Sequence, residues 1–485
     1  MAAYGLVYSI AARARFVFYL LLVTSCVVLP AQSQGQGRGQ GQGQGQAQQE
    51  VALPEGPAKA IIETSCVSCH NLNRTTSAGH SRAEWQGVID MMVTSGAELP
   101  ADQIPVVVDY LAANFPDRSP KAVLVPGAVE VSIKEWTVPT PGSRPHDPLV
   151  APDGMIWYTG QRANVMGRFD PKTEQFKEYH LPTENSGPHG LAADKEGNIW
   201  YTGNGAALIG KLDPKTGGVK EWKMPDPKAR DPHTPIFDKR GILYFTLQGA
   251  NMVGRIDPKS DPVPENVKLI SMPTARSNPY GMVVGSDGTI YFCEFGGNRL
   301  AKIHPDTMEL TEYTLPDPAA RPRRIAITPD DVLWYSDYAR GYLGRYDPAT
   351  GKHAEWPSPG GPKSQPYGIT AIGNIIWYSE SGVEPNTMVR FDPKTGKHTE
   401  WPSPGGSGSQ PYGITAIGNI IWYSESGVEP NTMVRFDPAT EKFQTWIIPS
   451  GGGVVRNVSP TPDGGEIWLA TSGVNGIARV TIKSN

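Results

Sequence analysis

The sequence predicts a small all-α domain followed by an all-β propeller of four-stranded blades. Apolar residues recur at helical spacing within residues 51–120. From residue 126 to residue 485 the chain repeats itself every 43 to 47 residues, and each repeat holds four short strand patterns separated by turn signals. A period of this length with four strands is typical of a propeller blade.

Residues 1–33 have the pattern of an export signal. Arg13 and Arg15 precede an apolar run over residues 16–29, and Ala31-Gln32-Ser33 is a small-x-small cleavage site. The run is shorter than the roughly 20 apolar residues that span a membrane. We therefore expect cleavage near Ser33, a mature chain without a membrane span, and a periplasmic or otherwise exported bacterial protein.

An alternative is a lipoprotein anchored at Cys26, because Val23-Thr24-Ser25-Cys26 is similar to a lipobox. Residues 34–50 consist mainly of Gly and Gln, and we expect them to form a disordered linker.

The strongest chemical motif is Cys66-Val67-Ser68-Cys69-His70. In a C-x-x-C-H motif the two thiols bind haem vinyl groups covalently and the adjacent imidazole ligates the iron, which predicts one haem c. The alternative is a structural thiol pair beside an unrelated His. A mature exported chain keeps only Cys66, Cys69 and Cys293, whereas a disulfide-built fold would normally show several even pairs.

Three apolar stripes around this motif predict three helices. Their residues are Ala58, Ile61 and Ile62; Trp85, Val88, Ile89 and Met92; and Ile104, Val107, Val108, Leu111 and Ala112. The segment resembles a class I cytochrome c domain over residues 51–120, of the kind attached to periplasmic dehydrogenases. The resemblance implies Met92 as the sixth iron ligand, while the residues themselves leave Met91 and His80 as alternatives.

The propeller region contains eight repeats. The residues that open the innermost strands are His146, His189, His233, Tyr280, Arg323, Tyr367, Tyr412 and Asn457. Two repeats are near copies, because residues 365–393 and 410–438 are identical, so we read seven blades plus one duplicate. The last repeat supplies three strands and residues 129–138 carry an isolated strand pattern. We expect that strand to close the ring at the last blade.

The repeated Pro-His-Gly, Trp-Tyr-Thr and Ile-Gly-Arg/Lys motifs resemble the virginiamycin B (streptogramin) lyase family, propellers that open a streptogramin ring by metal-dependent C–O elimination. The resemblance covers residues 126–485 and implies the fold more strongly than the reaction. It implies a catalytic site at His189, His233 and Asp231. The position where the family carries a Glu falls near Gln248, which cannot act as a base.

Equivalent positions of the repeats should lie at one height of the central channel. His146, His189 and His233 would then form an imidazole arc, opposite the acids that end the second strands of repeats four to seven, Glu294, Asp337, Glu380 and Glu425. Such a funnel could hold a divalent metal (Mg²⁺ or a transition metal), an anion or a polar small molecule. The alternative is that these polar residues bind neighbouring backbone at strand ends.

The formal net charge is -4 and the sequence has no cluster of basic residues, which argues against a nucleic acid partner. Three functions remain. The sequence favours a haem-mediated electron-transfer oxidoreductase, which needs an electron-transfer partner protein and a small-molecule ligand at the propeller mouth. The alternatives are a streptogramin-type lyase, which leaves the haem unexplained, and a propeller that binds a ligand without catalysis. The substrate stays undefined.

Overall fold

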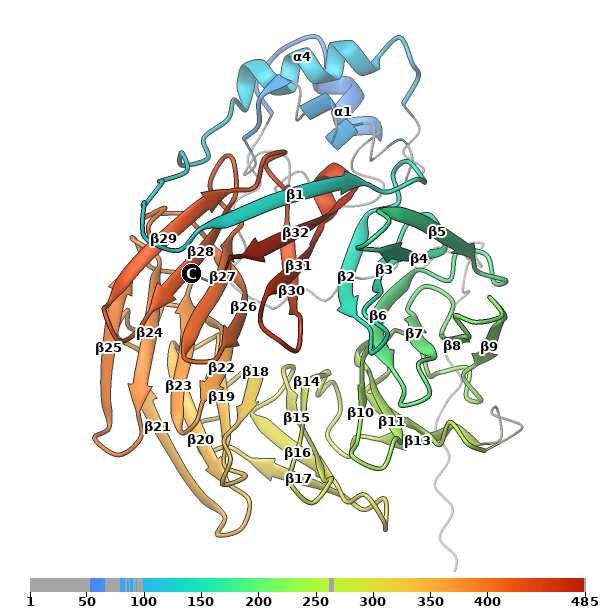
Figure 1. The fold of residues 1–485 in the computed structure, drawn as a ribbon, viewed down its shortest axis with the longest axis vertical. Coiled ribbons are helices and arrows are strands. Elements are labelled where there is room, and N and C mark those ends of the chain that lie inside the picture. The colour runs from blue at the N-terminus through green and yellow to red at the C-terminus, as the bar shows by residue number, and fades with distance from the viewer. Residues whose placement is uncertain are drawn as a thin grey trace, which may run out of the picture. The chain divides into compact units, whose positions relative to one another are not determined.

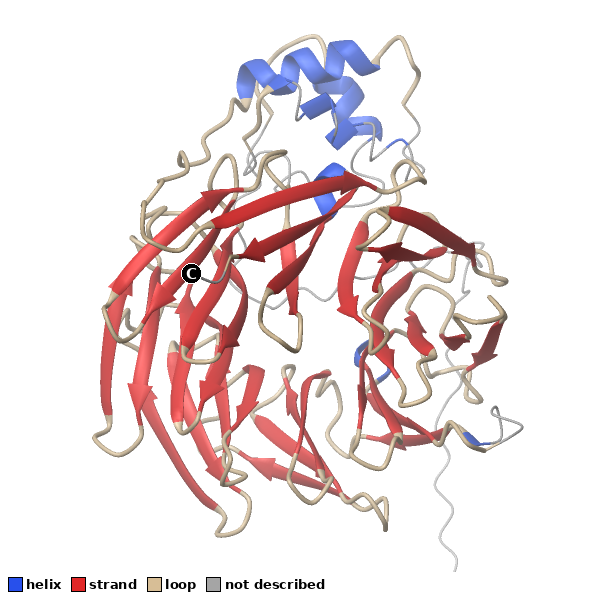
Figure 2. Cartoon of the chain, in the orientation of Figure 1, coloured by secondary structure: helices blue, strands red, loops and turns tan. Residues whose placement is uncertain are grey.

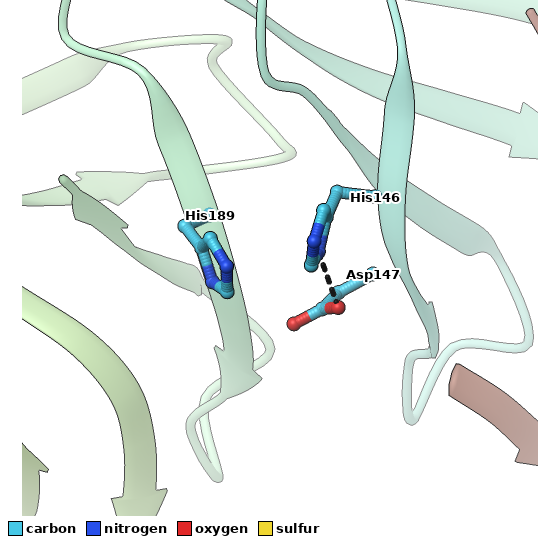
Figure 3. Close-up of side chains that lie close together, drawn as sticks. All are labelled: His146, Asp147 and His189. Carbon is cyan, nitrogen blue, oxygen red and sulfur yellow. Dashed lines mark hydrogen bonds and ion pairs between the residues drawn. The ribbon is translucent and has the colours of Figure 1, made fainter. Parts of the chain in front are cut away.

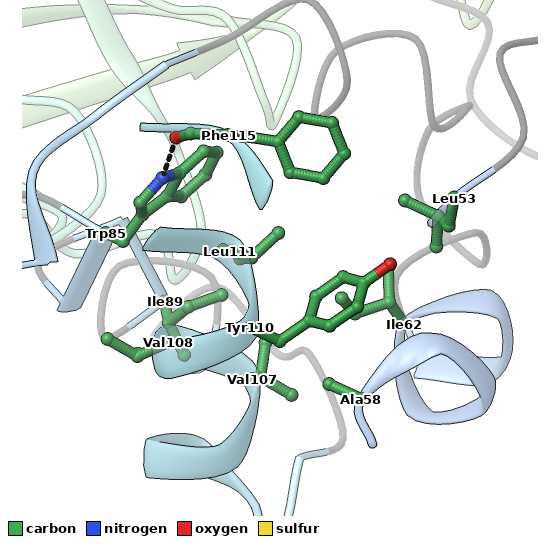
Figure 4. Close-up of a cluster of buried hydrophobic side chains, with 10 residues drawn as sticks. All are labelled: Leu53, Ala58, Ile62, Trp85, Ile89, Val107, Val108, Tyr110, Leu111 and Phe115. Atoms are coloured by element: carbon green, nitrogen blue, oxygen red, sulfur yellow. Dashed lines mark hydrogen bonds between the residues drawn. The ribbon is translucent and has the colours of Figure 1, made fainter. Parts of the chain in front are cut away.

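The computed structural model describes residues 53–65, 79–82, 85–86, 88–89, 93, 99–260 and 266–483. In the N-terminal part, helix α1 spans Lys59–Ser65 and helix α4 spans Ile104–Asn114. Both contribute to one apolar core, shown in Figure 4. Its buried members are Leu53, Ala58, Ile62, Trp85, Ile89, Val107, Val108, Tyr110, Leu111 and Phe115.

The three predicted apolar stripes thus meet in one core. Trp85 comes from the middle stripe, and its indole Nε1 donates a hydrogen bond to the Phe115 carbonyl at 2.8 Å. Among the described residues no helix has the length and apolar character needed to cross a membrane.

The rest of the chain forms eight four-stranded antiparallel sheets arranged as the blades of a propeller (Figures 1 and 2). Blades one to four consist of β2 (Pro145–Val150), β3 (Ile156–Gly160), β4 (Val165–Asp170), β5 (Gln175–His180); β6 (Pro188–Ala193), β7 (Ile199–Gly203), β8 (Leu208–Leu212), β9 (Val219–Lys223); β10 (Pro232–Phe237), β11 (Leu243–Leu247), β12 (Met252–Ile256), β13 (Lys268–Ser271); and β14 (Pro279–Val284), β15 (Ile290–Glu294), β16 (Arg299–Ile303), β17 (Leu310–Thr314).

Blades five to eight consist of β18 (Pro322–Ile327), β19 (Leu333–Asp337), β20 (Tyr342–Asp347), β21 (Lys352–Pro357); β22 (Pro366–Ile372), β23 (Ile375–Glu380), β24 (Thr387–Asp392), β25 (Lys397–Pro402); β26 (Pro411–Ile417), β27 (Ile420–Glu425), β28 (Thr432–Asp437), β29 (Lys442–Ile447); and β30 (Val455–Pro460), β31 (Glu466–Thr471), β32 (Gly476–Ile482), β1 (Val131–Thr137). Short 3₁₀ turns, η1 (Gln248–Ala250) and η3 (Ser472–Val474), follow β11 and β31. The prediction of eight four-stranded repeats is confirmed.

The ring closes as the isolated strand pattern predicted. Strand β1 pairs antiparallel with β32 over its whole length, from Val131 with Ile482 to Thr137 with Gly476. Figure 1 shows this early strand lying beside the final one. The last blade is therefore built from both ends of the propeller sequence, and no blade lacks its outer strand.

Buried tryptophans fill the spaces within and between blades. The six predicted core residues, Trp157, Trp200, Trp334, Trp377, Trp422 and Trp468, are all at most 2% exposed. In five blades the indole of this Trp stacks on a Trp of the outermost strand, as for Trp200 and Trp222 with centroids 5.8 Å apart. The repeated stack explains why the motif recurs at one position of each repeat.

A buried hydroxyl on the second strand joins neighbouring blades next to the channel. The Thr202 Oγ1 of blade two accepts a hydrogen bond from the Gly190 amide at 2.9 Å and donates one to the His233 carbonyl of blade three at 2.9 Å. Hydroxyls at the same position make the same kind of bridge from Thr159, Ser336, Ser379 and Ser424. In blade four this position is the buried Cys293.

Replacing Thr202 with Val should lower the free energy of unfolding by about 1–3 kcal/mol, because a buried amide and a buried carbonyl both lose their partner at nearly constant side-chain volume. Chemical denaturation measures this. The matched control is Thr216→Val, which removes a hydroxyl from an exposed turn where it donates to Asp213. Equal losses in the two variants would contradict the bridging role.

Candidate functional site

The register of the inner strands defines which residues line one level of the channel. In blades one to seven the inner strand begins with a Pro that pairs with the last residue of the second strand, and the next residue is the predicted opener. Blade eight differs, because Val455 pairs with Thr471 in place of the Pro. Asn457 therefore occupies the position of Asp147, one residue beyond that of His146.

The three predicted histidines do form an arc. The ring centroids of His146 and His189 lie 4.2 Å apart, and those of His189 and His233 lie 4.1 Å apart. His233 continues the arc to Tyr280 of blade four, with a centroid distance of 5.3 Å. Imidazoles from three blades that are adjacent in space thus line one side of the channel.

Asp147 joins this arc, although the sequence analysis did not select it. Its carboxylate lies 2.8 Å from Nδ1 of His146 and accepts a hydrogen bond from the Asn457 amide of blade eight at 2.6 Å. One donor atom each from His146, Asp147 and His189 lies within 4.8 Å of the others. In the part of the chain that the structure describes, this is the only such group of three metal-ligating side chains, and Figure 3 shows it.

A sequence signal for Asp147 exists in retrospect. The residue after the opening His is Asp in blade one, Gly in blade two and Thr in blade three. An acidic residue that directly follows a channel-lining residue, where other repeats have a small residue, is itself a candidate to line the channel.

The electrostatics of the arc differ along it. Burial is the largest influence on the Asp147 carboxyl and works to raise its pKa, yet the hydrogen bond and charge of His146, with His189 and Asn457, hold that pKa well below its ordinary value. Burial lowers the pKa of His233 to about 4 and that of His189 well below its ordinary value. The arc at neutral pH therefore combines a carboxylate with two neutral imidazoles.

The four predicted acids do not join the histidines in a metal-ligating group. Glu380 accepts hydrogen bonds from the Ser358 hydroxyl at 2.5 Å, the Gly360 amide at 3.0 Å and the Thr387 hydroxyl at 2.6 Å. Glu425 is held in the same way by Ser403, Gly405 and Thr432. Since Ser358 and Ser403 directly follow the outermost strand of the preceding blade, these acids fasten one blade to the next.

Asp337 likewise accepts bonds from the Arg321 amide and from the Arg340 guanidinium, which lies 2.8 Å away. Asp337, Glu380 and Glu425 thus bind local groups and lie outside the group formed by His146, Asp147 and His189, and their role as metal ligands stays a prediction. The alternative, that polar residues at strand ends bind local groups, describes them correctly.

Glu294 occupies the same register but is buried in blade four beside Glu312. Burial, followed by the negative charge of Glu312, raises the pKa of Glu294 to about 8. At neutral pH the side chain is therefore mostly protonated, which is not the form in which a carboxylate ligates a metal.

Asp231, the predicted catalytic acid, is bound within a loop. Its carboxylate accepts hydrogen bonds from the Asn204 side-chain amide and from the Gly249 backbone amide, the latter at 3.1 Å. Burial raises its pKa. The structure thus brings His189 and His233 together, and leaves Asp231 outside the His146, Asp147 and His189 group.

The predicted haem ligands Cys66, Cys69, His70 and Met92, together with the alternative Met91, lie outside the described residues, and so does Cys26. His80 is described, and its ring meets Trp85 edge to face at a centroid distance of 4.8 Å. The identity of the sixth iron ligand stays a prediction.

Part of the chain is similar to one propeller family. Residues 127–263 match the model of the virginiamycin B lyase family. This stretch holds β1, blades one and two, and the first three strands of blade three, and so carries all three histidines of the arc and Asp147.

Solved structures agree on the fold. The virginiamycin B lyase of Staphylococcus aureus is 23% identical, with a TM-score of 0.51, and the alignment covers 73% of this chain and 100% of that one. A catalytically inactive variant of the S. aureus enzyme with quinupristin gives 24% identity, a TM-score of 0.50 and the same coverage. No curated protein matches the chain.

Glu294→Gln tests the protonated state of the buried acid. Because the folded pKa is about 8 and the ordinary value is 4.5, the native state binds the proton more tightly, and the contribution of Glu294 to stability is lost as pH rises from about 5 to 8. The variant should match the wild type near pH 5 and exceed it near pH 9 by on the order of 3 kcal/mol.

Denaturation curves across this pH range measure the difference. The control Glu425→Gln, at the same register, should be less stable than the wild type at pH 9, because it disturbs three hydrogen bonds. A pH-independent difference for Glu294→Gln would contradict the raised pKa.

Proposed function

We propose that the protein is an exported c-type cytochrome whose propeller binds a transition-metal ion and a small ligand in its channel, and that it works as an electron-transfer oxidoreductase. The observation that carries this proposal is the group formed by His146, Asp147 and His189 in a chain that also contains a C-x-x-C-H motif.

The donor set and its spacing fit a metal ion. Metal bonds to imidazole nitrogen and carboxylate oxygen measure about 2.0–2.2 Å, so two ligands of one ion lie at most about 4.4 Å apart. The three donor atoms here lie within 4.8 Å of one another, so small side-chain rotations bring them onto one ion. Nδ1 of His189 is buried and has no hydrogen-bond partner, as expected for an atom reserved for a ligand.

Two imidazoles and one carboxylate favour a transition metal over Mg²⁺, because Mg²⁺ prefers oxygen ligands and keeps several waters. Such an ion, when bound, would supply Lewis acid or redox chemistry. The protein's own contribution is orientation. Asn457 holds Asp147, and Asp147 fixes the ring of His146 through its Nδ1.

The haem would be held by Cys66, Cys69 and His70, with Met92 as the sixth ligand, and would carry single electrons. Helix α1 ends at Ser65, one residue before Cys66, and its Ile62 is buried in the apolar core. A helix that packs on an apolar core and ends at the residue before the motif suits covalent haem attachment.

A streptogramin-type lyase is the second candidate. It is favoured by the family match over residues 127–263 and by the contact of His189 with His233. The acid of that site argues against a lyase, because the Asp231 carboxylate already accepts hydrogen bonds from Asn204 and Gly249. A propeller that binds a ligand without turnover is the remaining outcome.

His189→Ala should lower the affinity for Zn²⁺, Mn²⁺ or Fe²⁺ by at least about tenfold, since it removes one of three protein ligands. Metal analysis and titration of the exported protein measure this. The control His180→Ala removes an exposed imidazole from β5 of blade one, and metal binding should be unchanged. Equal affinities in wild type and His189→Ala would refute the metal site.

The same preparation tests the haem. A pyridine haemochrome assay should give one haem c per chain, and this haem should disappear in Cys66→Ser produced in a host that attaches haem. His189→Ala should keep the haem spectrum while slowing haem reduction by a donor that acts at the propeller channel. Turnover of a streptogramin by wild type and Met92→Ala, but not by His233→Ala, would instead establish the lyase.

A further inference from the structure

Two neighbouring arginines of β18 lie on the side of the channel that the metal proposal does not use. Arg323 occupies the register position of the histidines, and Arg324 occupies that of Asp147. Neither forms an ion pair within the described residues: Nε of Arg323 is buried without a hydrogen-bond partner, and Nη2 of Arg324 donates to the Tyr367 hydroxyl at 3.1 Å. Arg323 is one of the predicted strand openers, whereas Arg324 was not predicted from the sequence.

Aromatic rings hold both guanidinium groups. The Arg323 guanidinium lies 5.1 Å from the ring centre of Phe295, 4.6 Å from that of Tyr338 and 4.7 Å from that of Tyr367. The Arg324 guanidinium lies 5.1 Å from Tyr280 and 5.3 Å from Tyr367. Stacking on ring faces fixes a guanidinium plane and leaves its N–H edge to bind an acceptor.

Arg340 of the same blade is a structural arginine and serves as a comparison. Arg340 lies 2.7 Å from Asp317, 2.8 Å from Asp337 and 2.7 Å from Glu355, so its charge is neutralised by three carboxylates. The pair formed by Arg323 and Arg324 carries two positive charges with aromatic neighbours and no carboxylate partner among the described residues. A partly buried double charge of this kind is stabilised when an anion binds to it.

The positive charges of the two arginines change the pKa values of neighbouring groups. Burial alone would raise the pKa of Tyr367, but the charges of Arg324 and Arg323 and the hydrogen bonds with Tyr412 and Arg324 lower it to about 8. The Arg324 charge also contributes to the low pKa of His233, after burial.

We propose that Arg323 and Arg324, with the hydroxyl groups of Tyr367 and Tyr412, form a binding site for an oxyanion group of the ligand, a carboxylate or a phosphate. Guanidinium forks match both groups geometrically, and a phenol O–H adds a neutral donor when it turns to the anion, as that of Tyr367 would from its present bond to Tyr412. Tyr367 and Tyr412 are already joined by a hydrogen bond of 3.0 Å, which places both hydroxyls beside Arg324.

The site adjoins the histidine arc. Tyr280 contacts Arg324 on one side and the His233 ring on the other, with distances of 5.1 and 5.3 Å. A ligand anchored by its anionic group at β18 would therefore extend toward the imidazoles. The inference rests on β18 and its aromatic neighbours, so it stands whether or not a metal binds at His146.

Calorimetric titration of the full-length protein with sodium acetate, sodium succinate and inorganic phosphate, at constant ionic strength set with chloride, tests the site. We expect saturable binding of a carboxylate or of phosphate, at least about tenfold weaker in Arg324→Gln. Tighter binding of succinate or of phosphate identifies the preferred oxyanion. The matched control is Arg345→Gln on β20, whose partner is Asp347, and it should bind like the wild type. Binding that is unchanged in Arg324→Gln, or absent for all three anions, overturns the proposal.

A second measurement covers the case in which Arg324→Gln does not fold. Spectrophotometric titration of the tyrosines in the wild type should show a phenol that ionises near pH 8 and is missing from Tyr367→Phe. A saturating oxyanion should raise the pH of this transition, because it neutralises the two guanidinium groups that face Tyr367. Unaltered titration in the presence of the anion overturns the proposal. His189→Ala should retain anion binding, which separates failure of this site from failure of the metal site.

Discussion

The chemistry of the channel depends on the hydroxyls that join five of the blades to the next blade. A Thr or Ser in the middle of the second strand bonds to an inner-strand amide of its own blade and to an inner-strand carbonyl of the next. The carbonyl belongs to a channel-lining residue, as in His189, His233 and Tyr367. Because one hydroxyl bonds to the inner strands of two blades, at 2.9–3.4 Å, these bonds fix the relative height of side chains that come from different blades.

Much of the propeller could be predicted from periodicity. The eight repeats, the closing strand and the buried tryptophans follow from local patterns, because each blade packs mainly on its neighbours and each repeat faces the same surroundings. The imidazole arc was predictable for the same reason. Side chains at one register position of adjacent blades must lie close together, and His146, His189 and His233 do.

The remaining features of the site depend on residues that lie one position after the strand openers, where they depart from the repeat consensus. Asp147 and Arg324 occupy a position that is Gly or Thr in most other blades, so a consensus reading passes over them. The local partners of the acids Glu380 and Glu425 could not be predicted for a different reason. Their partners, Ser358 and Ser403, lie at the ends of the preceding blades, and such a contact between repeats has no signature within a single repeat.

The duplicated blade affects the width of the channel but not the histidine arc that lines it. Residues 365–393 and 410–438 are identical, yet Tyr367 contacts Arg324 while Tyr412 contacts Tyr367, so each copy takes its role from the blade that precedes it. The copies lie in blades six and seven, away from the histidine blades one to three. A ring that lengthens by copying a blade there gains circumference and one more phenol, while the imidazole arc keeps its immediate neighbours. The width of the channel and the reactive side chains that line it can thus change independently in this architecture.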